Sequence, residues 1–157
     1  MIDELEQWVE STVAEFVNQA QSCSILHSEI GHYYPLEFLE CCYFVVIDEV
    51  PKPPIGSISD PNIVDFISMR VAAITYKNIY FIKPRYINEI HLHVHELVHV
   101  VQWNKLGVKG FIERYINELN KYKYADAPLE VMAYHIGEQF TRSRKAFDVH
   151  SYVEQQI

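Results

Sequence analysis

The segment His95-Glu96-Leu97-Val98-His99 contains the residue types from which a catalytic metal site is built. Residues four apart lie on one face of an α-helix, so both imidazoles can reach a single metal ion. Glu96 is rotated by about 100° from His95 around a helix, and it therefore flanks the ion without binding it. A carboxylate at that place can accept a proton from a water molecule on the ion. The spacing predicts a zinc site in which Glu96 is the general base.

The residues around this segment indicate a buried helix. Apolar side chains occupy most of its other positions: Leu92, Val94, Leu97, Val98, Val100 and Val101. Imidazole and carboxylate groups in such a helix cost free energy unless they are paired or bind a metal. The alternative is that His95 and His99 are satisfied core residues and no metal binds. His91 lies one turn before His95, but one ion cannot be bound by three consecutive turns of a straight helix, so we expect it beside the site or exposed. We assign no role to His93.

A zinc site of this kind needs a third ligand from elsewhere in the chain. One known pattern places Gly and then His shortly after the second histidine, but this chain has Gln102 and Lys105 there, which excludes it. The best remaining candidate is Glu130, in the first turn of a helix that opens with Pro128. Ala133, one turn later, is small enough to let that helix approach the histidine helix. The other downstream candidates are Glu113, Glu118, Asp126, His135, Glu138, Asp148 and His150. We expect the acids among residues 111–119 to be solvated.

At this point the sequence resembles a known family. The run from His95 to Gln102, followed by Pro128-Leu129-Glu130-x-x-Ala133-Tyr134, is similar to the zinc metallopeptidases with a glutamate third ligand, the gluzincins. It resembles most their minimal bacterial domains. Residues 73–81 are also similar to the strand pair that precedes the metal helix there. The resemblance covers about residues 70–140, and residues 1–68 lie outside it.

The resemblance implies a zinc metallopeptidase that acts on a peptide or protein substrate. His95, His99 and Glu130 would hold zinc, and Glu96 would activate a zinc-bound water to attack a peptide carbonyl. Tyr134 is our candidate for stabilising the charge that develops on the carbonyl oxygen; the alternative is an ordinary core tyrosine. A different class of function is a non-catalytic binding domain stabilised by zinc. The intact Glu96 favours catalysis, because a purely structural site has no need of it.

The elements that position these residues are predicted from hydrophobic periodicity. Helices are expected over residues 2–22, 86–106, around 111–119 and from Pro128 to about residue 144, with Gly107 ending the second. Strands are expected at residues 43–47, 69–75 and 79–82, the last two as a hairpin. Ile79–Ile82 has two interpretations, an open edge for a peptide or an ordinary paired strand. We expect a single α+β domain over residues 1–157, zincin-like, with a short antiparallel sheet.

Composition narrows the functional classes. The net charge of −8, with scattered basic residues, argues against a nucleic-acid partner. We expect no membrane partner, because no apolar stretch approaches the roughly 20 residues that span a bilayer. The first residues are acidic, unlike a secretory signal, and the cysteines, Cys23, Cys41 and Cys42, do not suggest a disulfide framework. These features predict a cytoplasmic protein.

Overall fold

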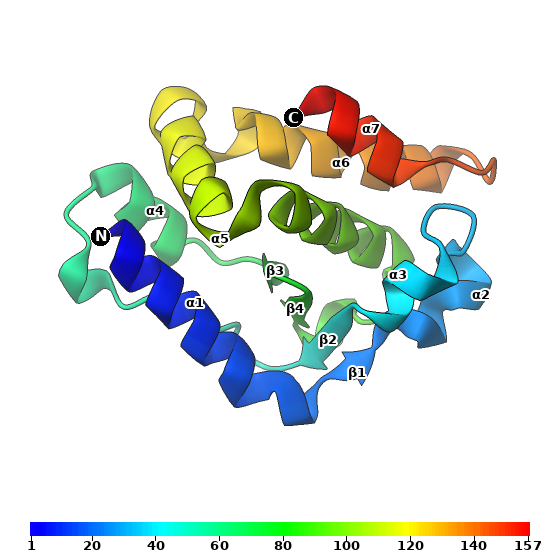
Figure 1. Cartoon of the computed structure of the whole chain (residues 1–157), viewed down its shortest axis with the longest axis horizontal. Coiled ribbons are helices and arrows are strands. Elements are labelled where there is room, and N and C mark those ends of the chain that lie inside the picture. The colour runs from blue at the N-terminus through cyan, green and yellow to red at the C-terminus, as the bar shows by residue number, and fades with distance from the viewer.

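The computed structural model describes residues 1–157, with the exception of the side chain of Ser57. The chain is an α+β structure of helices and one small sheet (Figure 1). The helices are α1 (Ile2–Phe16), α2 (His27–Ile30), α3 (Leu36–Glu40), α4 (Pro61–Ser68), α5 (Ile90–Asp126), α6 (Pro128–Arg142) and α7 (Val149–Gln156). The strands are β1 (Gln21–Ser22), β2 (Tyr43–Val46), β3 (Ala73–Tyr76) and β4 (Ile79–Ile82).

The sheet has the strand order β1-β2-β4-β3 and is mixed. β1 pairs antiparallel with β2 and β3 antiparallel with β4, whereas β2 and β4 are parallel. The expectation of an antiparallel sheet is therefore wrong. The connection through α4 leads from β2 to β3 on the far side of β4, and the β3–β4 hairpin then reverses the chain so that β4 lies parallel to β2. β4 is paired on both sides, so the interpretation of Ile79–Ile82 as an open edge is also wrong; the edge strands are β1 and β3.

Alternation along the strands divides the sheet into two faces, each covered by a helix. On one face, the Tyr80 hydroxyl lies 2.6 Å from Nδ1 of His93, on α5. On the other face, Phe81 packs edge-to-face against Phe16 of α1, with ring centroids 5.1 Å apart. α1 is shorter than predicted, because Gln21–Ser22 leave the helix to pair with β2. The sheet is thus held between α1 and the histidine-bearing part of α5.

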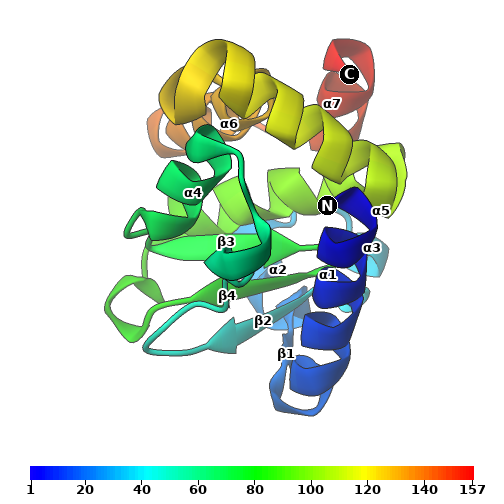
Figure 2. The same ribbon diagram turned by 90° about the vertical axis from the view of Figure 1, so that its left-hand side faces the viewer.

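Gly107 divides α5 into two helical parts that run in different directions (Figure 1). Its φ of 71° is in the region that favours glycine, which confirms the predicted end of the histidine helix. The first part begins at Ile90, later than predicted, because residues 84–86 form a separate 3₁₀ turn. The second part passes above α4 in Figure 2 and leads through Ala127 into α6. This break lets one continuous stretch of chain present two walls to the same site.

α6 lies directly against the first part of α5 (Figure 1). The contact is close at Gly137, where an added Cβ would lie 3.3 Å from the His91 carbonyl oxygen and 3.6 Å from Cβ of His95. Ala133, predicted to allow this approach, is completely buried. Among the described residues, no helix is both long and apolar enough to cross a membrane.

Candidate metal centre

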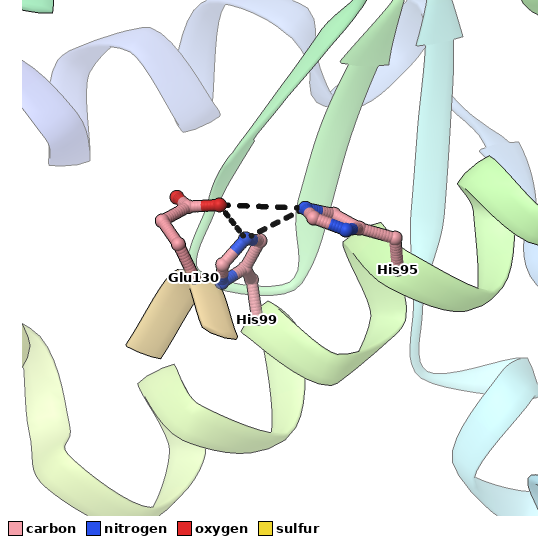
Figure 3. Close-up of side chains that lie close together, drawn as sticks. All are labelled: His95, His99 and Glu130. Atoms are coloured by element: carbon pink, nitrogen blue, oxygen red, sulfur yellow. Dashed lines mark hydrogen bonds and ion pairs between the residues drawn. The ribbon is translucent and has the colours of Figure 1, made fainter. Parts of the chain in front are cut away.

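His95 and His99 project from the first part of α5 and meet Glu130 from the first turn of α6 (Figure 3). The Nε2 atoms of the two histidines are 3.2 Å apart. Oε2 of Glu130 lies 3.5 Å from each of them. All three residues are buried, with exposed fractions of 4–6%. The structure therefore brings together the three residues that the sequence predicted as ligands, as a group that can hold a metal ion.

These distances agree with the ligand spacing of a tetrahedral ion. With metal–ligand bonds of about 2.0–2.1 Å, neighbouring ligand atoms lie about 3.3–3.4 Å apart. The separations in this group are 3.2, 3.5 and 3.5 Å. Oε2 of Glu130 is buried and has no hydrogen-bond partner, although it faces two imidazole nitrogens. A carboxylate oxygen left in that position is suited to coordinate a cation.

Gln102 determines which nitrogen of His99 carries the proton. Its side-chain Nε2 donates to the Leu129 carbonyl oxygen at 2.9 Å, which directs Oε1 toward His99. Oε1 is 2.8 Å from Nδ1 of His99 and can only accept, so Nδ1 of the imidazole carries hydrogen. In the neutral ring, the Nε2 lone pair then faces the centre. This is the tautomer that a metal-binding histidine requires.

Two residues from the second part of α5 hold Glu130 and the start of its helix in position. The Tyr115 hydroxyl donates to Oε1 of Glu130 at 2.6 Å, leaving Oε2 free to face the histidines. Glu118 accepts a hydrogen bond from the backbone N–H of Leu129 at 2.8 Å, and it also binds Arg114 at 2.8 Å. Glu118 was expected to be solvated, and this expectation is wrong: its carboxylate is buried and accepts from the Leu129 N–H, one of the groups at the start of α6 that have no partner within the helix.

The group formed by His95, His99 and Glu130 stabilises positive charge. Burial opposes ionisation of Glu130, but His99 and His95 outweigh it and hold the Glu130 pKa well below its usual range. Burial likewise disfavours the charged form of His99, yet the Glu130 carboxylate raises the His99 pKa to about 9. A proton or a metal cation can supply this positive charge. A metal needs neutral imidazoles and so releases protons when it binds.

Glu96 lies beside the three ligands without joining them. Its Oε1 is 4.0 Å from Nε2 of His95, and its exposed fraction is 3%. The other oxygen, Oε2, accepts a hydrogen bond of 2.6 Å from the Thr75 hydroxyl on β3. Thr75 therefore holds the carboxylate in place and leaves Oε1 directed toward the centre. This is the arrangement predicted for a general base next to a metal.

Tyr134 is close to the centre but is not a core residue. Its ring packs edge-to-face on His95 with centroids 4.5 Å apart, and 45% of the residue is exposed. Its hydroxyl is 3.2 Å from that of Tyr124, a residue that the sequence did not indicate. Burial raises the pKa of Tyr134, so the phenol keeps its proton. Its proposed catalytic role remains a prediction.

The remaining candidates lie away from the centre. Glu113, Asp126, His135 and Glu138 are exposed, Asp148 caps α7 and His150 packs on Phe38. His91 is exposed, in agreement with one of the two expectations for it. His93 has a structural part, since Nε2 donates to the Ile87 carbonyl oxygen at 2.7 Å and Nδ1 accepts from Tyr80 at 2.6 Å. It anchors the start of the histidine helix on the sheet.

No protein-family model, curated protein or solved structure matches this chain. The candidate centre therefore depends on its own geometry. That geometry shows a buried group, His95, His99 and Glu130, that can hold a metal ion.

Proposed function

We propose that this chain is a zinc-dependent hydrolase with a zincin-like fold, acting on peptide or related amide bonds. One observation carries the proposal: a carboxylate, Glu96, is held 4.0 Å from Nε2 of His95, next to three ligand atoms at tetrahedral spacing. A site that only stabilises a fold has no use for such a group. Structural zinc sites are also typically rich in thiolates, whereas catalytic sites use histidine with a carboxylate and keep a position open.

Zinc held by His95, His99 and Glu130 would polarise the scissile carbonyl and make a water molecule more acidic. Glu96 accepts the proton of the attacking water at Oε1 and then passes it to the leaving amine. The hydrogen bond from Thr75 keeps this carboxylate oriented through both transfers. Tyr134, neutral because burial raises its pKa, is placed to donate a hydrogen bond to the carbonyl oxygen as negative charge develops.

The edge strand β3 supports a peptide as the substrate. β3 pairs only with β4, so its other edge has no strand partner, and Thr75 of this strand is hydrogen-bonded to Glu96. An extended segment can add to such an edge through main-chain hydrogen bonds. The peptide-binding edge proposed here is therefore residues 73–76, beside Thr75 and Glu96, in place of the strand first considered from the sequence.

The substitution Glu96→Gln tests the proposal, because it keeps the shape of the side chain and removes its basicity. We expect zinc content and thermal stability to stay close to those of the parent protein. Hydrolysis of a peptide library, followed by mass spectrometry, should fall at least about a hundredfold, the scale of losing a general base. The matched control is Glu113→Gln, an exposed change on the same helix, which should leave the rate unaltered.

Equal cleavage by the parent protein and by Glu96→Gln would mean that Glu96 is not the base. Failure of the zinc-loaded parent protein to cleave any peptide of the library would favour the other candidate function, a binding domain stabilised by zinc. The near-complete burial of the four site residues, 3–6% exposed, is the observation on which that alternative depends.

A further inference from the structure

A cavity of about 120 Å³ adjoins the metal-site residues. His95, Glu96, His99 and Glu130 form part of its wall, and the edge strand β3 forms another part. The second half of α5 contributes mainly apolar and aromatic side chains, including Phe111, Tyr115 and Tyr124. A group bound at the metal therefore has direct access to this space beside it.

Five more wall residues come from α1 and α4, within residues 1–68, which lie outside the resemblance. α1 supplies Leu5 and Val9, four residues apart on one helical face, and α4 supplies Ile63, Phe66 and Ile67. Figure 2 shows α4 above β3, and α1 at the end of β3 where the chain turns into β4. Val9 is 3% exposed, so it is a fixed part of the wall and not a surface side chain.

Charged side chains occupy only one part of the cavity wall. Among its described residues, the only Asp, Glu, Lys, Arg or His side chains are those of the metal centre and Glu96. A charged group entering this space would lose its hydration and find no partner of opposite charge apart from the reactive centre. An apolar group would exchange water for aromatic and aliphatic contacts. The wall therefore selects against charge.

The volume of the cavity limits the size of the group that can bind in it. An apolar cavity of about 150 Å³ in another protein accommodates benzene. A space of about 120 Å³ is suited to one branched aliphatic side chain, or to a single ring after a small adjustment of the wall. It is too small for a second residue.

We propose that this cavity is a specificity pocket that takes one large uncharged apolar side chain of the substrate, and that Leu5 and Val9 of α1 limit its capacity. The inference rests on the proposed function, because it places this side chain next to the bond that is cleaved. It assigns a role to the N-terminal helix, which otherwise only covers one face of the sheet.

The test uses amino-acid hydroxamates, which share one metal-binding group and differ only in side chain. Their affinities for the zinc-loaded protein are measured by calorimetry, with glycine hydroxamate as the reference. We expect the leucine and phenylalanine compounds to bind at least about tenfold more tightly than those of aspartate and lysine. Affinities equal within about twofold, or no binding of any compound, would overturn the proposal.

Two variants test whether α1 forms part of the pocket wall. Val9→Ala removes two methyl groups from the pocket and should shift the preference from the leucine toward the phenylalanine compound by about threefold or more. Val13→Ala is the control, since Val13 lies one turn further along α1, packs against the core, and is not part of the cavity wall. An equal shift in both variants, or none in Val9→Ala, contradicts a role for α1.

The outcomes separate this inference from the proposed function. If the protein prefers apolar hydroxamates but cleaves no peptide, the pocket is supported as a binding site and the hydrolase function is contradicted. If the protein cleaves library peptides with no enrichment of apolar residues beside the cut bond, the hydrolase function is supported and the specificity pocket is contradicted.

Discussion

The Tyr115 hydroxyl donates a hydrogen bond of 2.6 Å to Oε1 of Glu130, while Oε2 of the same carboxylate lies 3.5 Å from each histidine. Tyr115 thus decides which oxygen is presented to a metal. Burial, together with the Glu130 carboxylate, raises the pKa of Tyr115 well above its usual value, so it remains a donor. Tyr115→Phe should weaken zinc binding about 10- to 100-fold, the range for losing an oriented ligand contact.

Competition with a fluorescent chelator measures this affinity. Tyr122→Phe removes a hydroxyl from an exposed residue of the same helix and should change nothing. Unaltered affinity in Tyr115→Phe would mean that Glu130 is fixed by packing alone.

Replacement of Glu130 tests the ligand set. Glu130→Ala should lose zinc about as severely as His99→Ala, because both contribute one atom to a group with spacings of 3.2–3.5 Å. Zinc per chain after gel filtration is the measurement. Glu113→Ala is the control, as Glu113 was a candidate from the sequence but is exposed. Full zinc content in Glu130→Ala would exclude it as the third ligand.

The histidine helix, its end at Gly107 and the convergence of Glu130 on it were predictable from the sequence, because each follows from local spacing or from a turn residue. The residues that orient the ligands were not. Thr75 and Tyr115 meet the site only through tertiary contacts, and nothing in their neighbourhoods in the sequence distinguishes them from other strand or helix residues. Gln102 was part of the resemblance, but its two opposed hydrogen bonds are visible only once α6 lies beside α5.

The mixed sheet was missed for a similar physical reason. Strand direction depends on the route of the connection through α4, and this short helix follows a proline-rich stretch that has the composition of a loop. The burial of Glu118 was missed because the apolar pattern of its helix places it among polar positions. Its partners, Leu129 and Arg114, become evident only when the following helix is in place.

Thr75 offers a way to separate catalysis from metal binding. Its hydroxyl binds Oε2 of Glu96 at 2.6 Å but does not contact a ligand atom of the metal group. Thr75→Val has a similar shape and removes the donor, so zinc affinity should stay within about threefold while peptide cleavage falls about tenfold or more, as for a mispositioned base. Thr75→Ser restores the donor and should recover most of the rate. A parallel loss of zinc in Thr75→Val would indicate a general structural effect instead.

The cysteines allow the stability of the sheet to be followed directly. Cys41 is exposed, whereas Cys23 and Cys42 are buried. Burial raises the pKa of the Cys23 thiol to about 12, and burial also raises that of Cys42 well above its usual value. Because the thiolate is the reactive form, one thiol should react quickly with Ellman's reagent at pH 8 and two at least about a hundredfold more slowly. Cys41→Ser should remove the fast phase alone, and three fast thiols would contradict the buried arrangement.

The slow phase also reports on the metal centre. Cys23 contacts the Tyr80 hydroxyl, with Sγ 3.7 Å from the oxygen, and Tyr80 in turn binds His93 on the metal helix. Labelling of Cys23 and Cys42 therefore requires the sheet beneath that helix to open. A metal that binds only the folded chain stabilises it in proportion to its occupancy, about 2.7 kcal/mol at a hundredfold excess over Kd. Zinc should then slow the two buried thiols about a hundredfold without affecting Cys41, and it should have no such effect in Glu130→Ala. If zinc slows all three thiols equally in both proteins, it is binding the thiols themselves and not the site formed by His95, His99 and Glu130.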